Sequence, residues 1–205
     1  MMLSAAKPGK KGLTSLFIDG EFAVKVDTAV FEASDIKIGS GITDEELRAL
    51  IQKSDECRAY EKGLYLLGYR AHSQKELAEK LSRVFPREAA RKAVSRLAEL
   101  GLADDEAYAY SRASYLFNRK GFSPYRVKFD LRQKGIDEST AEKVVGQTCP
   151  DTVEKIKEII KKKYPAFASD EKVKRRAANA LRRLGYGWED IIGAFDALES
   201  GDDFY

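Results

Sequence analysis

Apolar residues recur at helical spacing along most of the chain after residue 43. Thr43 and Ser73 are each followed three residues later by a glutamate, which is the capping-box pattern of a helix start. Glycines follow three of the apolar segments and indicate helix ends: Gly101, Gly135 and Gly185. The pattern predicts ten helices with short connections, over residues 43–53, 55–69, 73–83, 86–100, 104–119, 123–134, 137–146, 151–163, 170–184 and 187–199.

The pattern before residue 43 is that of strands rather than helices. Asp19-Gly20 separates two runs of β-forming residues and predicts a hairpin, because both turn positions must accept positive φ. Residues 30–32 and 36–38 could add short strands, and residues 1–12 are expected to form a flexible tail. A sheet this small needs another element to pack against.

The helices after residue 55 form three groups that resemble one another at an offset of 50 residues. The middle helix of each group carries two apolar residues four positions apart: Leu77 and Leu81, Val127 and Leu131, Ala177 and Leu181. This spacing places each pair on one helix face. A unit of about 45 residues buries little surface alone, so neighbouring units are expected to stack.

The predicted fold is therefore mainly α, with tandem three-helix repeats in an elongated curved array and a small N-terminal β-hairpin or sheet. The expected organisation is a tail over 1–12, a hairpin region with a helix over 13–54, repeats over 55–102, 103–150 and 151–199, and a C-terminal tail over 200–205.

Charge is abundant but nearly balanced over the 205 residues, with 36 Lys and Arg against 33 Asp and Glu and a net charge of +3. The total is no argument for nucleic-acid binding. Locally, however, residues 112–134 contain seven basic residues and one acid, and residues 155–183 contain eleven and three. A local excess of this size creates a positive surface.

The sequence lacks the residues that several classes of function require. The chain has one histidine, two distant cysteines (Cys57 and Cys149) and no glycine-rich phosphate loop. No nucleophile–base pair or metal cluster is identifiable, so we expect no enzymatic activity, no catalytic residue, no metal site and no cofactor. No apolar run approaches the about 18 residues of a membrane span, and residues 1–12 do not resemble a secretory signal. We therefore expect a cytoplasmic protein without membrane contact.

Three motif-bearing segments carry a family resemblance: Leu67-Gly68-Tyr69-Arg70 with Ser73 and Glu76-Leu77; Leu100-Gly101-Leu102 with Asp104-Asp105 and Tyr108-Ala109; and Lys120-Gly121 with Pro124, Arg126-Val127 and Lys134-Gly135-Ile136-Asp137. In order and spacing they resemble the RecX family over residues 58–147. Residues 151–199 resemble the family's more variable third repeat, and residues 13–53 resemble the extension of its longer members. Phe122-Ser123 departs from the pattern, because family members often have a second glycine there.

The resemblance implies a non-catalytic regulator of the RecA recombinase. RecX family members bind RecA, lie in the groove of its filament on single-stranded DNA, and suppress strand exchange and co-protease activity. By this resemblance we expect a monomer that modulates, and mostly inhibits, the recombinase, ATPase and co-protease activities of RecA in homologous recombination, DNA repair and the SOS response.

Basic residues are the candidates for contacts with RecA or with single- or double-stranded DNA: Arg70, Lys75, Arg112, Arg119, Lys120, Arg126, Lys128, Arg132, Lys134, Arg175 and Arg182. The competing interpretation of each is a solvated helix face or an internal ion pair. The aromatic residues clustered between 108 and 129 are expected to be mostly core, with Tyr125 retained as a candidate contact for nucleobases. The alternative function is a stand-alone DNA-binding module of the helix-turn-helix type.

Overall fold

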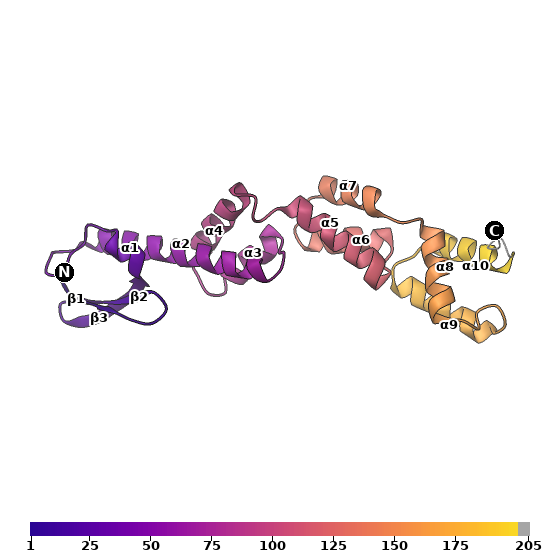
Figure 1. Ribbon diagram of the computed structural model, residues 1–205, viewed down its shortest axis with the longest axis horizontal. Coiled ribbons are helices and arrows are strands. Elements are labelled where there is room, and N and C mark those ends of the chain that lie inside the picture. Colours follow the sequence, from indigo (N-terminus) through magenta and orange to yellow (C-terminus); the bar gives the residue numbers. More distant parts are fainter. Residues whose placement is uncertain (201–205) are drawn as a thin grey trace. The chain divides into compact units, whose positions relative to one another are not determined.

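The computed structural model describes residues 1–200 and divides into two compact units, residues 1–104 and the residues from Asp105 onward (Figure 1). The first unit begins with an antiparallel sheet of β1 (Leu3–Pro8), β2 (Leu13–Ile18) and β3 (Glu21–Asp27), in the order β1-β2-β3. Asp19 and Gly20 both have positive φ, at 49° and 90°, which confirms the predicted hairpin.

The prediction of a flexible tail over residues 1–12 is wrong. Residues 3–8 form β1 and pair with β2, and Leu3 is fully buried. Lys11 and Gly12 take positive φ, at 59° and 66°, and supply the turn between the two strands. The predicted C-terminal tail lies, apart from Ser200, outside the described residues.

No strand follows β3 in the described part of the chain, contrary to the short strands expected over 30–32 and 36–38. Residues 28–32 instead form α1 (Thr28–Glu32), because Asp27 caps it by accepting a hydrogen bond from the Val30 amide at 3.1 Å. Leu3, Leu16 and Val26 of the sheet pack with Leu50 of the next helix. The small sheet therefore has the packing partner that it needs.

One helix, α2 (Asp44–Tyr69), replaces the two helices predicted over 43–53 and 55–69. Its start is the predicted capping box of Thr43 and Glu46. Ser54, at the expected break, is buried within the helix, and its hydroxyl accepts a hydrogen bond from the Asp27 amide at 2.7 Å. The expected boundary between residues 54 and 55 therefore falls inside a continuous helix that joins the sheet to the first repeat.

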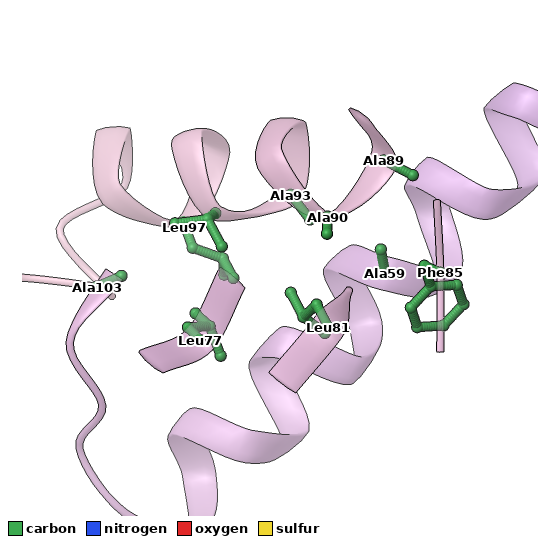
Figure 2. Packing of buried hydrophobic residues seen from close by; sticks show 10 residues of the cluster. Ala59, Leu77, Leu81, Phe85, Ala89, Ala90, Ala93, Leu97 and Ala103 are labelled. Atoms are coloured by element: carbon green, nitrogen blue, oxygen red, sulfur yellow. The ribbon is translucent and has the colours of Figure 1, made fainter. Parts of the chain in front are cut away.

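The first repeat consists of the C-terminal part of α2 with α3 (Gln74–Leu81) and α4 (Arg87–Glu99). Figure 2 shows its core, in which Leu97 of α4 points toward Leu77 of α3. Gly63 of α2 permits this packing, since a Cβ atom there would lie 2.6 Å from Leu97 Cδ1. A Cβ atom at position 63 would therefore require the Leu97 side chain to shift.

The second unit contains the other two repeats. The second has α5 (Asp105–Tyr115), a π-helical turn η1 (Leu116–Lys120), α6 (Pro124–Gln133) and α7 (Glu138–Thr148); the third has α8 (Thr152–Lys163), α9 (Glu171–Arg183) and α10 (Trp188–Glu199). The predicted periodicity is confirmed, because all six residues of the three middle-helix pairs are fully buried. In each repeat the third helix packs on the first helix. No described helix is long and apolar enough to cross a bilayer.

Candidate interaction surface

The middle helices α3, α6 and α9 present comparable outward faces. Each begins at a side chain that accepts a hydrogen bond from its first turn: Ser73, Ser123 and Asp170. The buried pair of each helix fixes which face points inward, so residues two positions before and after its first member point away from the core. Lys75 and Arg175 are exposed at equivalent positions of α3 and α9.

Arg70 is part of a local network at the end of α2. Its Nη2 atom lies 2.7 Å from Glu76 Oε1, and its Nη1 donates a hydrogen bond to the Ala71 carbonyl at 2.8 Å. The buried His72 places its Nδ1 3.2 Å from Glu76 Oε2, and burial lowers the pKa of this imidazole. Arg70 therefore joins α2 to α3, as the ion-pair interpretation expects.

Three basic candidates of the second repeat hold its helices together. Arg112 of α5 forms a two-point ion pair with Asp130 of α6, with Nε–Oδ1 and Nη2–Oδ2 distances of 2.8 and 3.0 Å. Lys128 Nζ lies 2.6 Å from carboxylate oxygens of both Glu138 and Glu142 of α7, and Arg132 Nε lies 2.8 Å from Glu138 Oε2. These contacts raise the pKa of Lys128 and lower that of Glu138. Much of the positive charge counted in this segment is thus neutralised internally.

Arg126 lies where the second and third repeats meet. Its guanidinium donates to the main-chain carbonyl of Arg183 and lies 4.2 Å from the centre of the Phe122 ring. The Ser123 amide donates to the Leu184 carbonyl at 3.0 Å. Gly185 completes the junction, with φ of +94° and an ideal Cβ position only 2.6 Å from Ser123 Oγ. Both groups that Arg126 contacts are neutral, so its positive charge is retained at this junction.

Several of the remaining basic candidates face solvent. Arg119, Arg175 and Arg182 are exposed and form no ion pair with another residue within the described range 1–200. Lys120 is exposed, with its Nζ 5.7 Å from the centre of the Tyr115 ring. Lys134, at the end of α6, is half-buried. The structure thus separates the sequence-predicted set into residues that stabilise the repeats and residues that face solvent.

The aromatic residues between 108 and 129 also divide into buried residues and residues that face solvent. Tyr108 and Phe117 are buried, as predicted, but the core prediction is wrong for Tyr115 and Phe129, which are exposed. Tyr125 and Phe129 lie one turn apart on α6 and are 77% and 53% exposed. Val127 and Leu131 occupy the inward face, so the two rings point to solvent. The sequence could have indicated that Phe129 is exposed, because the offset of 50 residues aligns it with the polar residues Glu79 and Asn179.

One group of metal-ligating side chains occurs within residues 1–200. Ligand atoms of Asp27, Cys57 and Glu61 lie within 4.8 Å of one another. Burial, together with the charges of Asp27 and Glu61, raises the pKa of the Cys57 thiol. In the absence of a metal ion, this environment favours the protonated thiol over the thiolate.

The fold defines a class of protein: a series of three-helix repeats preceded by a small antiparallel sheet. Two family models match the chain, that of the first three-helix domain of RecX over residues 59–97 and that of its second over residues 104–145. A regulatory protein RecX of Chlorobium phaeobacteroides (strain BS1) is 32% identical over 147 residues, which cover 71% of this chain and 96% of the relative. The chain belongs to the RecX family of regulatory proteins.

More distant relatives extend the similarity over nearly the whole chain. Regulatory protein RecX of Clostridioides difficile (strain 630) is 24% identical over 193 residues, covering 93% of this chain and 91% of the relative. A crystal structure of a regulatory protein RecX superposes with a TM-score of 0.67 at 23% identity, covering 95% of this chain and 98% of that one. The fold is therefore shared beyond the two matched repeats.

Proposed function

We propose that this protein binds RecA and its filament on single-stranded DNA in the cytoplasm and lowers the recombinase, ATPase and co-protease activities of RecA. Membership of the RecX family supports a regulatory role. The proposed binding surface is identified by three arginines that are exposed and form no ion pair among residues 1–200: Arg119, Arg175 and Arg182. Open guanidinium groups suit a partner with acidic side chains and DNA phosphates.

The direct test is the DNA-dependent ATPase of RecA on single-stranded DNA. Adding the protein well below one copy per RecA should lower the steady rate, because a regulator in a filament groove acts on several subunits. An unchanged rate at a stoichiometric amount would contradict the proposal.

A charge-removal variant tests the surface. Replacing Arg119, Arg175 and Arg182 by alanine together should raise the inhibitor concentration needed for half inhibition by about tenfold, since exposed charges mainly set association. The matched control replaces three exposed lysines of the first unit: Lys10, Lys25 and Lys37. Equal inhibition by the two variants would place the RecA contact elsewhere.

The alternative is a stand-alone DNA-binding module, with Arg175 and Arg182 seven residues apart on the middle helix α9. It predicts tight binding of duplex DNA without RecA and a steep dependence on salt. On α6, the equivalent helix, the outward positions carry aromatic rings instead of groups that read base edges in a major groove. This difference between equivalent helices favours the RecA regulator over a module that repeats one groove-reading surface.

A further inference from the structure

The outward face of α6 bears an aromatic pair that the fold does not require. Tyr125 and Phe129 expose most of their ring surface to solvent, and four residues of helix separate them by about 6 Å along the axis. The repeat core is already complete without them, since Val127 and Leu131 are fully buried on the opposite face. Two large exposed rings on one face are typical of an interaction surface.

The other two repeats provide an internal comparison. At the positions equivalent to Tyr125 and Phe129, α3 carries Lys75 and Glu79, and α9 carries Arg175 and Asn179. All three helices keep the same inward pair, so the same packing tolerates polar outward residues. The aromatic pair is therefore a property of α6 alone among the three middle helices.

The charges around the rings identify the ligand class. On one flank of α6, Lys128 and Arg132 are neutralised by Glu138 and Glu142 of α7. On the other flank, Asp130 lies one turn after Arg126 and is paired with Arg112 of α5. Arg126 contacts the Phe122 ring and the Arg183 carbonyl and forms no ion pair within residues 1–200, so its charge is not neutralised. This contact brings Arg126 to the end of α9, where the exposed Arg182 and Arg183 add positive charge.

We propose that Tyr125 and Phe129 form a stacking platform for the unpaired bases of a single-stranded nucleic acid, with Arg126 and Arg182 near its phosphates. Exposed rings beside open guanidinium groups are the combination that binds single strands, because every base has a π-face and every nucleotide has a negative phosphate. Duplex DNA keeps its bases stacked and cannot offer them to the rings. This site goes beyond the proposed function, since it gives the chain a nucleic-acid contact independent of RecA.

The test is a fluorescence-anisotropy titration of a labelled oligothymidylate with the full chain, without RecA. Replacing both rings, Tyr125→Ala with Phe129→Ala, should weaken binding by about tenfold or more. The pair Tyr125→Leu with Phe129→Leu keeps apolar area without the rings and should be equally weak. The pair Tyr125→Phe with Phe129→Trp keeps two aromatic surfaces and should bind like the unmodified chain.

Salt dependence separates the rings from the charges. The ring variants should keep the slope of log affinity against log salt, because they leave the phosphate contacts in place. Arg182→Ala should reduce that slope by about 0.7, the contribution of one phosphate contact on a single strand. Both rings are exposed, and a thermal unfolding curve of each variant checks that the fold is retained.

Each outcome bears on the proposal separately from RecA regulation. Undiminished oligothymidylate binding by the alanine pair would overturn the platform. Absence of oligothymidylate binding by the unmodified chain would also overturn it, and loss of RecA inhibition in the alanine pair would then show that the rings contact protein. If the unmodified chain binds oligothymidylate but does not inhibit RecA, and the alanine pair loses that binding, the platform is upheld and the proposed function is refuted.

Discussion

The middle helices of the second and third repeats, α6 and α9, share an inward face and differ in their outward one. Both bury an apolar pair four residues apart. Outward, α6 carries exposed rings and basic side chains that are mostly paired with acids, whereas α9 carries exposed arginines at 175 and 182 without ion pairs within residues 1–200. Packing therefore constrains one face of the repeat, and the other face is free to acquire a separate function.

The largest effect should come from the shared inward face. Leu131→Ala in α6 and Leu181→Ala in α9 each remove a fully buried side chain and leave a cavity. Each should lower the free energy of unfolding by about 2–5 kcal/mol. Urea denaturation of the two variants measures this. Losses that differ strongly would show that the two positions are not equivalent and that α6 and α9 do not share an inward face.

The junction between the two repeats should be the next most sensitive place. Gly185→Ala places a methyl group 2.6 Å from Ser123 Oγ at a φ of +94°, whereas Gly101→Ala meets a φ of +69° with open space around it. We expect about 1–2 kcal/mol of backbone strain at Gly101 and a larger loss at Gly185, where the steric clash is added. Thermal unfolding compares the two variants, and an equal loss would mean that the repeats do not pack at Gly185.

The difference between paired and open arginines should appear as opposite effects on stability and function. Arg112→Ala leaves the half-buried Asp130 without its two-point partner and should cost about 1–2 kcal/mol of stability. Arg182→Ala should change stability by less than about 0.5 kcal/mol, because the side chain is exposed. Inhibition of the RecA ATPase should weaken more in Arg182→Ala than in Arg112→Ala. Each variant is measured at a temperature where it is folded. A functional loss confined to Arg112→Ala would contradict the separation.

The last prediction concerns stability at alkaline pH only. Tyr186 occupies in the third repeat the position of Ile136 in the second, and burial raises its pKa to about 12 from 10.0. A raised pKa in the folded state means that the unfolded chain loses its proton first as pH rises. The contribution of Tyr186 is therefore complete below pH 10 and is lost between pH 10 and about 12.

Tyr186→Phe isolates this effect from the lysines that titrate in the same range. The variant should lose less stability than the unmodified chain between pH 10 and 12 in chemical denaturation at stepped pH. Parallel curves for the two proteins would show that the tyrosine ionises freely in the folded state.

Local signals in the sequence predicted most of the helical fold. The caps at Thr43 and Ser73 and the apolar pairs of the middle helices are short-range patterns, and all are confirmed. Strand β1 could not be predicted in the same way, because it exists through pairing with residues of β2 farther along the chain. The role of Ser54 likewise depends on a residue far along the chain, because its hydroxyl accepts a hydrogen bond from the Asp27 amide.

The candidate surface was less predictable because it depends on which charges are neutralised. Arg112, Lys128 and Arg132 are basic residues of the same segment as Arg119, and only the folded chain brings Asp130, Glu138 and Glu142 against the first three. Composition counts all of these residues alike. Distances between side chains separate those that stabilise the repeat from those that can meet a partner.

We propose that the RecA filament is contacted by the open arginines of the second and third repeats. The most direct test is the RecA ATPase titration with the chain that carries alanine at 119, 175 and 182, beside the chain with alanine at Lys10, Lys25 and Lys37. The concentration for half inhibition should rise by about tenfold in the arginine variant and stay unchanged in the lysine variant. Full inhibition by the arginine variant at the original concentration would contradict the proposal.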